Sequence, residues 1–153
     1  MSTKEFTFHS IFGSAFDFEG DPIALTRIEI PIIQRDYAQG RLNEEVGRIR
    51  DRFLDALHQS LVNNKKITLD FVYGDLSSNG VLTPLDGQQR LTTLFLLHWY
   101  IAKKEAIPNS DSEFLNCFTY STRFSSRDFC KELIHYSPYF EALELSSAIK
   151  DQA

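Results

Sequence analysis

The chain has 153 residues, of which 42% are hydrophobic and 24% are charged. This length and composition predict one globular domain and exclude a disordered, collagen-like or coiled-coil chain. The net charge of −5 excludes a uniformly basic surface, so any contact with a polyanion must come from a local basic patch.

The sequence also predicts a cytoplasmic protein with no membrane partner. Its N-terminus has no apolar segment of the signal-peptide type, and the apolar runs on either side of His98 are far shorter than a membrane span. Cys117 and Cys130 lack the spacing of a zinc site, and we interpret them as ordinary thiols of a reducing compartment.

The first third of the chain contains one predicted strand and the start of a long helix. The Phe-rich residues 1–20 fit a loose helix and an extended arm equally well. Residues 25–33 are dense in β-branched side chains and predict a strand that is interrupted near Pro31. Residues 44–62 carry apolar side chains at steps of three and four behind Asn43, a favourable N-cap, and predict an amphipathic helix.

The middle of the chain predicts a hairpin followed by two helices. Alternation over residues 67–73 and an apolar stretch over 81–85 indicate two strands, with a turn at 77–80. A helix over 88–104 is apolar nearly all round, which is typical of a helix in the middle of a core. A capping-box pattern of Ser and Asp predicts a further helix over 126–135.

These elements predict an α+β fold, in which a small mixed sheet packs on helices and the helix after residue 87 is central and buried. We expect one domain over residues 1–136 and, in 137–153, the start of a helical region of a longer protein. Residues 115–120 fit a short strand and a helix equally well. The expected core is Ile28, Ile30, Val46, Ile49, Phe53, Leu57, Leu69, Phe71, Leu91, Leu94, Phe95, Leu97 and Ile101.

The sequence Asp86-Gly87-Gln88-Gln89-Arg90 joins the second hairpin strand to the central helix. Gly87 allows close approach of the backbone, and the N–H groups of the first helical turn favour an anion. Arg90 lies one turn into the helix with a planar fork that suits phosphate, and Asp86 could hold a magnesium ion or orient a water. Further donors and acceptors come from Gln88, Gln89, Thr92 and Thr93. A capped helix without a ligand fits the same spacing.

Two other polar clusters are candidate anion sites. Gln34 and Arg35 follow the first predicted strand and could contact a base or a phosphate, although Arg35 and Asp36 also fit an ordinary solvated pair. Arg123 and Arg127 flank a serine-rich helix start, which is a natural anion cradle and equally a capped helix with solvated arginines.

Three segments, IPIIQRDY, PLDGQQRLTTLFLLHWY and FTYSTRFSSRDF, occur in this order. Together they resemble the N-terminal domain of GmrSD-type, modification-dependent restriction endonucleases, over about residues 10–136. The resemblance implies a ParB/sulfiredoxin-like fold, in which a strand–turn–helix unit binds nucleotide phosphates. It also implies nucleoside-triphosphate binding and hydrolysis coupled to DNA restriction in anti-phage defence.

The resemblance implies that the three clusters converge on one nucleotide site that uses Mg²⁺. The residues that we expect to be catalytic are Asp86, Gln89 and Arg90, with Asp86 also a candidate magnesium ligand. The residues that we expect to bind the nucleotide or its phosphates are Gln34, Arg35, Gly87, Gln88, Gln89, Arg90, Thr93, Arg123 and Arg127.

The first hypothesis is a nucleotide-binding sensor domain of a restriction system, with Mg²⁺ and a nucleoside triphosphate as its ligands. No nuclease motif of the HNH type is present, so DNA contact is expected through the full-length protein or a partner. The sequence leaves open whether this chain hydrolyses the nucleotide, and it predicts no oligomeric state. The other hypotheses are a DNA-binding module without hydrolysis and a scaffold for a separate nuclease.

Overall fold

The computed structural model describes residues 4–31, 44–121 and 124–140, with residues 124–127 described by their backbone alone. Within these ranges the chain forms six strands, three α-helices and two short 3-10 helices. In chain order the elements are β1 (Ala15–Phe18), β2 (Asp21–Ala24), β3 (Arg27–Ile30), α1 (Glu44–Val62), β4 (Tyr73–Leu76), β5 (Val81–Asp86), α2 (Gln88–Lys104), two 3-10 helices (Asn109–Asp111 and Glu113–Cys117), β6 (Phe118–Tyr120) and α3 (Phe124–His135).

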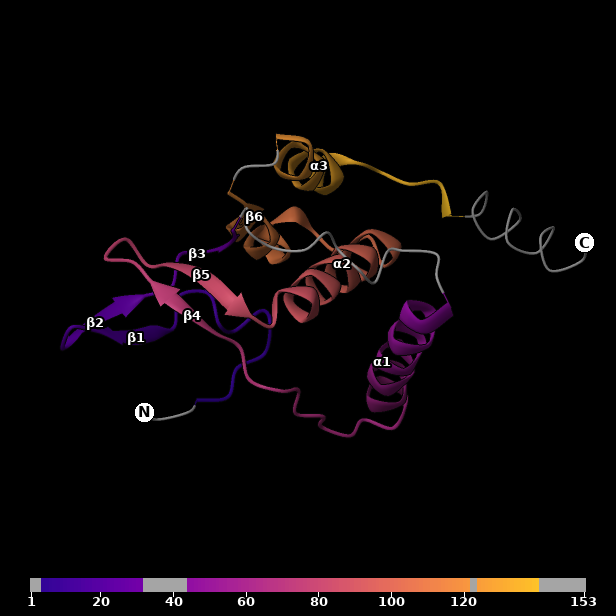
Figure 1. The fold of residues 1–153 in the computed structure, drawn as a ribbon. Coiled ribbons are helices and arrows are strands. Elements are labelled where there is room, and N and C mark those ends of the chain that lie inside the picture. The colour runs from indigo at the N-terminus through magenta and orange to yellow at the C-terminus, as the bar shows by residue number, and fades with distance from the viewer. Residues whose placement is uncertain (1–3, 32–43, 122–123, 141–153) are drawn as a thin grey trace, which may run out of the picture.

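β3 is an inner strand of a four-stranded sheet with the order β4-β5-β3-β6. It pairs in parallel with both neighbours. Ile28 lies opposite Leu82 of β5 on one side and opposite Phe118 of β6 on the other. β4 pairs antiparallel with β5 and forms one edge. The sheet is therefore mixed, as the sequence predicts. In Figure 1, β5 leads into α2, which runs through the middle of the molecule.

The hydrophobic core lies between this sheet and α2. Ile28 and Ile30 of β3 are buried in one cluster with Leu91 and Phe95 of α2 and with Phe118 of β6. The rings of Phe95 and Phe118 are stacked, with their centroids 4.7 Å apart. Buried aliphatic side chains on an inner parallel strand are expected, since a helix covers the sheet face from which they project. The core therefore fixes α2 against the strands that precede and follow it.

The helix predictions are confirmed. α1 and α2 have the predicted bounds, 44–62 and 88–104. α3 begins at Phe124, two residues before the predicted start, so Ser125 lies in its first turn instead of capping it. The open alternatives for residues 115–120 are both partly right, because a 3-10 helix ends at Cys117 and β6 follows. The predicted cap Asn43, the strand end at 32–33 and residues 141–153 lie outside the described residues.

The hairpin is confirmed, but its first strand is not where the alternation places it. β4 begins only at Tyr73, and residues 67–72 form no strand. The reason is that Tyr73 lies opposite Asp86, the last residue of β5. Beyond Asp86 the chain turns into α2, so the residues before Tyr73 have no strand to pair with. Their alternation reflects an extended segment that runs past the end of its partner.

The first twenty residues contain β1, the first strand of a second hairpin. The sequence alone fits a loose helix and an extended arm equally well there. β1 and β2 pair antiparallel, with Phe18 opposite Asp21. The two residues between them, Glu19 and Gly20, have φ values of 53° and 97°. Two positive φ values are what a tight two-residue hairpin turn requires. The extended alternative is therefore right for residues 15–18.

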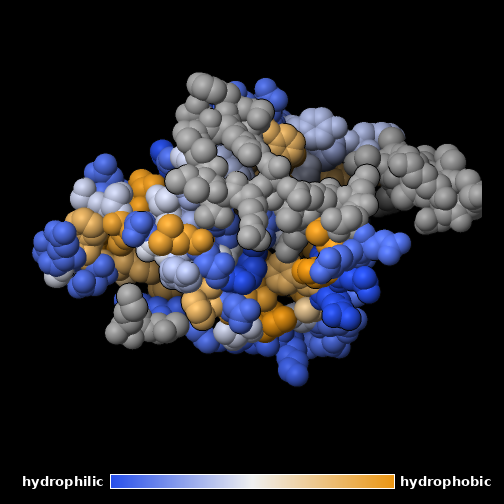
Figure 2. Space-filling view, viewed as in Figure 1, coloured by the Kyte–Doolittle hydropathy of each residue, from blue (hydrophilic) through white to orange (hydrophobic). Residues whose placement is uncertain are grey.

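The expected core is confirmed only in part: Ile28, Ile30, Leu91 and Phe95 belong to the core cluster and Leu94 packs against it, whereas the other eight expected members are not part of it. Ile49 in α1 is 55% exposed, and Phe71 before β4 is 67% exposed. In α1 the sole buried residue is Leu57, and the core cluster includes no residue of this helix. The helical period of α1 thus identifies an amphipathic helix without identifying what its apolar face covers. Apolar side chains also reach the surface at several separate places on the face drawn in Figure 2.

The two cysteines are free thiols, as expected. Burial raises the pKa of Cys130 to about 11 and also raises the pKa of Cys117 above its ordinary value. A buried thiol with a raised pKa is present as the unreactive protonated form at neutral pH. Cys130, which is buried in the core cluster, therefore has a packing role.

His98 of α2 lies against the ring of Phe8, with the centroids 5.1 Å apart, and its Nδ1 is 2.8 Å from the carbonyl oxygen of Leu94. Burial lowers the pKa of His98, because desolvation disfavours the charged imidazolium. The folded chain therefore holds fewer protons than the unfolded chain below the ordinary pKa of 6.5.

We predict that the free energy of unfolding falls as the pH decreases below 6.5, and that His98 carries part of this fall. Urea denaturation between pH 8 and pH 5 measures it. In His98→Gln, which does not titrate, the loss of stability over this range should be smaller than in the wild type. Identical pH dependence in the two proteins would contradict the assignment.

Candidate functional site

Gly87 is the single residue between β5 and α2, and its geometry admits little else. It is the N-cap of α2 with a φ of 84°, in the left-handed region that favours glycine. A Cβ at this position would come within 2.6 Å of Cγ2 of Val72 and 3.2 Å of Nη2 of Arg90. The segment before β4 therefore packs directly on the turn, and the start of α2 carries no capping side chain.

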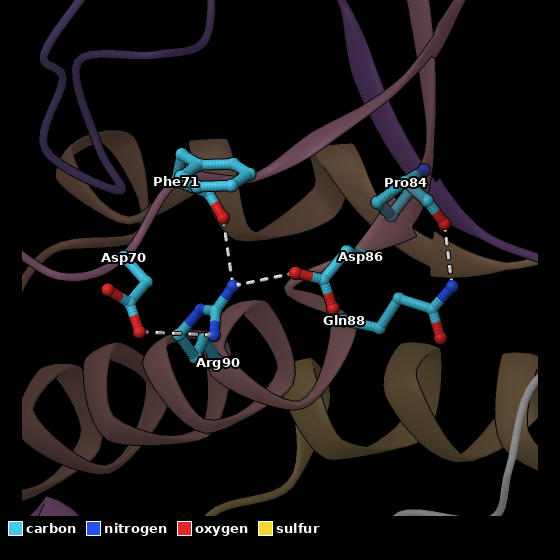
Figure 3. A network of polar contacts seen from close by, with 6 residues as sticks. All are labelled: Asp70, Phe71, Pro84, Asp86, Gln88 and Arg90. Atoms are coloured by element: carbon cyan, nitrogen blue, oxygen red, sulfur yellow. Dashed lines mark hydrogen bonds and ion pairs between the residues drawn. The ribbon is translucent and has the colours of Figure 1, made fainter.

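Arg90 lies over this turn and is anchored on two sides (Figure 3). Its Nη2 donates to the carbonyl oxygen of Phe71 at 2.8 Å and to Oδ2 of Asp86 at 3.2 Å. Its Nη1 is 4.0 Å from Oδ2 of Asp70. Its Nε is buried and has no hydrogen-bond partner among the described residues. The guanidinium is thus held beside the helix start by a carboxylate of the same motif.

The side chain of Gln88 turns back toward β5. It is buried, and its Nε2 donates to the carbonyl oxygen of Pro84 at 2.6 Å, as Figure 3 shows. Pro84 is itself buried, so this bond satisfies a carbonyl that water cannot reach. The Gln88 side chain therefore clamps the helix to the strand, and a ligand at the helix end would meet the backbone N–H of Gln88.

Two threonines of the next turn also face the protein interior. The hydroxyl of Thr93 donates to the carbonyl oxygen of Gln89 at 2.9 Å, within the same helix. The hydroxyl of Thr92 lies 2.9 Å from that of Tyr120 and links α2 to β6. Both threonines are buried. In this structure the predicted phosphate-binding residue Thr93 therefore lies on the packed side of α2.

Of the other predicted residues, Gln34, Arg35 and Arg123 lie outside the described residues, as does the side chain of Arg127. The structure does show where the chain leaves the sheet before each motif. β5, β3 and β6 are neighbours that run in the same direction, so their carboxyl ends meet at one edge of the sheet. The first motif follows β3, the second follows β5 and the third follows β6.

The backbone confirms that two of these ends are in contact. The N–H of Ser121, just after β6, donates to the carbonyl oxygen of Ile30 at the end of β3, over 2.9 Å. Ligands of open α/β sheets commonly bind outside the carboxyl ends of neighbouring parallel strands. The convergence of the three motifs on one site stays a prediction, because Gln34, Arg35 and Arg123 lie outside the described residues.

Sequence reasoning missed Asp70 and the exposed position of Phe71 beside the motif. Asp70 is 88% exposed, and together with Asp86 it gives Arg90 two carboxylate neighbours. The three described side chains sum to a charge of −1. The alternating segment before β4 is the sequence signal that contains Asp70 and Phe71. Alternation alone does not show where the strand pairing stops, so it does not place these residues beside Arg90.

The described residues contain no group of three or more side chains that could hold a metal ion. Mg²⁺ usually takes one or two carboxylates and completes its shell with phosphate oxygens and water. Asp86 is exposed and offers a carboxylate of this kind. The residues present therefore suit Mg²⁺ that arrives with a phosphate ligand.

A glycine turn leading from a parallel strand into a helix, with an arginine one turn in, defines a class of domains suited to binding anions. The comparisons identify the family: residues 16–152 match the model of the N-terminal domain of the GmrSD restriction endonuclease. The chain belongs to this family and is thus part of a DNA restriction system. No curated protein and no solved structure matches it. Within the described ranges, every helix is too short or too polar to cross a bilayer.

The buried bond of Gln88 leads to a stability prediction. Gln88→Ala removes the Nε2 donor and leaves the carbonyl of Pro84 unsatisfied, so we expect the free energy of unfolding to fall by about 1–3 kcal/mol. Urea denaturation followed by circular dichroism measures the change. The control is Gln59→Ala on the exposed side of α1, which should change stability by less than about 0.5 kcal/mol. Equal losses in the two variants would contradict a structural role for Gln88.

Proposed function

We propose that this domain binds a nucleoside triphosphate with Mg²⁺ at the sheet edge where β5, β3 and β6 end. The observation that carries the proposal is that three polar motifs follow the carboxyl ends of three neighbouring parallel strands. In this proposal the domain is the cytoplasmic nucleotide sensor of a modification-dependent, anti-phage restriction system. Its ParB/sulfiredoxin-like fold is part of the same proposal.

Each part of the Gly87 turn has a role in holding the phosphates. The uncapped start of α2 presents backbone N–H groups and the positive end of the helix dipole. Arg90 has five N–H donors, and its described hydrogen bonds both use Nη2. Nη1 forms a long ion pair with Asp70, at 4.0 Å, and would contact a phosphate oxygen when the ligand binds. Gln88 keeps the helix start in place through its bond to Pro84.

The local charge explains why the ligand should carry a metal ion. Arg90, Asp86 and Asp70 together sum to −1, which would repel a bare triphosphate. A Mg²⁺ ion held by Asp86 and by phosphate oxygens reverses the local sign. The predicted arginines at positions 35, 123 and 127 would add positive charge at the same edge.

The same arrangement suits phosphoryl transfer to water. Bound Mg²⁺ would neutralise charge on the phosphates, which is its usual contribution to this chemistry. Asp86 and Gln89 would orient the attacking water, and Arg90 would stabilise the charge that develops on the transferring group. Catalysis of this kind depends on positioning, and the anchored guanidinium of Arg90 supplies a fixed donor for it.

Isothermal titration with the four nucleoside triphosphates, each with MgCl₂ and with EDTA, tests the proposal. We expect Mg²⁺-dependent binding that weakens at least about tenfold in Arg90→Ala and in Asp86→Asn, a loss typical of a charge-assisted phosphate contact. The matched control is Arg52→Ala, which removes an exposed arginine of α1 and should leave affinity unchanged.

Arg90 also bonds to the backbone of Phe71, so circular dichroism must show that each variant is folded. Arg90→Lys, which retains the charge without the planar fork, should have an intermediate affinity. Nucleotide affinity that survives both Arg90→Ala and Asp86→Asn would contradict the proposal. So would salt-dependent binding of DNA with no response to any nucleotide, which would favour a DNA-binding module.

A further inference from the structure

Phe71 and Tyr73 form a pair of exposed aromatic rings beside the Gly87 turn. Their side chains are 67% and 54% exposed, and their ring centroids are 6.0 Å apart with an interplanar angle of 35°. Val72 between them packs on the core cluster and on Gly87. In an extended chain successive side chains point to opposite sides, so both rings face solvent on one side of the segment.

Contacts on both sides of Val72 place this ring pair next to the charged groups of the motif. The carbonyl oxygen of Phe71 accepts a hydrogen bond from Nη2 of Arg90 (Figure 3). Tyr73 lies opposite Asp86 at the end of the pairing of β4 with β5, just beyond a register shift between Tyr73 and Gly74. Paired residues of neighbouring strands project to the same face of a sheet. The rings, the carboxylate of Asp86 and the guanidinium of Arg90 therefore form one continuous surface.

The fold does not need these rings to be apolar. Val72 already provides the inward contact of this segment, and an exposed Phe next to an exposed Tyr gains little from burial. An apolar flat surface that adjoins a fixed cation and an exposed carboxylate matches the two unlike halves of a nucleotide. The base presents a flat π-face and the phosphates present oxygens, and stacking on aromatic side chains is the usual way in which proteins bind an open base.

We propose that Phe71 and Tyr73 are the base-binding half of the nucleotide site, so that the base of the triphosphate stacks on these rings while its phosphates lie at the start of α2. This inference rests on the nucleotide-binding function proposed above. It assigns a site to two residues that lie outside all three motifs.

Charge favours a mononucleotide over an unpaired base of DNA as the occupant. Asp70 is 88% exposed and lies directly before Phe71. A DNA strand would carry phosphates on both sides of a stacked base and would bring one toward this carboxylate. A nucleoside triphosphate carries its phosphates on one side alone, toward Arg90, and its bound Mg²⁺ offsets the charge of Asp70 and Asp86 there.

Titration of two probes separates base binding from phosphate binding. One probe is each nucleoside triphosphate with Mg²⁺, and the other is inorganic tripolyphosphate with Mg²⁺, which has no base. In Phe71→Ala and Tyr73→Ala the nucleotide affinity should fall by about fivefold to a hundredfold, as expected for loss of a stacking ring, while the affinity for tripolyphosphate stays unchanged. Phe71→Trp should restore the nucleotide affinity. Tyr136→Ala, which removes another exposed ring, is the matched control and should change neither affinity.

The outcomes distinguish this inference from the function on which it rests. Arg90→Ala should weaken both probes, because it acts on the phosphates. If nucleotide affinity depends on Arg90 but is unchanged in both ring variants, the base site is wrong and the proposed function stands. If the ring variants weaken both probes equally, or weaken binding of a single-stranded DNA oligomer while leaving nucleotide affinity intact, the base site is also wrong. A wild-type chain that binds neither probe overturns both proposals.

Discussion

The junction between β5 and α2 depends on one left-handed residue. Gly87 turns the chain from strand to helix without an intervening loop, and the side chain of Val72 occupies the space that a Cβ would need. Two hydrogen bonds, from Gln88 to Pro84 and from Arg90 to Phe71, then tie the helix to the strand before it and to the segment beside it. A ligand at this junction meets groups whose positions are already set by packing.

The described side chains at this junction carry a net negative charge, which opposes the binding of an anion. Arg90 is shared between the carboxylates of Asp86 and Asp70, of which the nearer, Asp86, is the last residue of β5. The pairing with Asp86 keeps the guanidinium in a fixed orientation, and it also lowers the attraction for phosphate. Under the proposed function, this charge distribution favours a phosphate ligand that brings its own cation, whereas a neutral aromatic base would not be repelled.

Local sequence patterns predicted the helices and the motif well, because both depend on neighbours in the chain. The apolar period of α1 and α2 and the glycine of the turn are such signals. The start of β4 and the exposure of Phe71 were not predictable in this way, since each depends on where β5 ends. The inward direction of Gln88 likewise depends on the carbonyl of Pro84, and whether the three motifs share a site depends on a strand order that no single segment encodes.

The position of β3 has a consequence for how the chain folds. This strand comes early in the sequence, yet its partners are Leu82 in one neighbour and Phe118 in the other. Sheets built from such distant segments have a high contact order and form slowly, because long loops must close before the pairing is rewarded. On the ribosome, β3 stays without one of its two neighbours until residue 118 has left the exit tunnel, and during that time the backbone groups along that edge are unpaired.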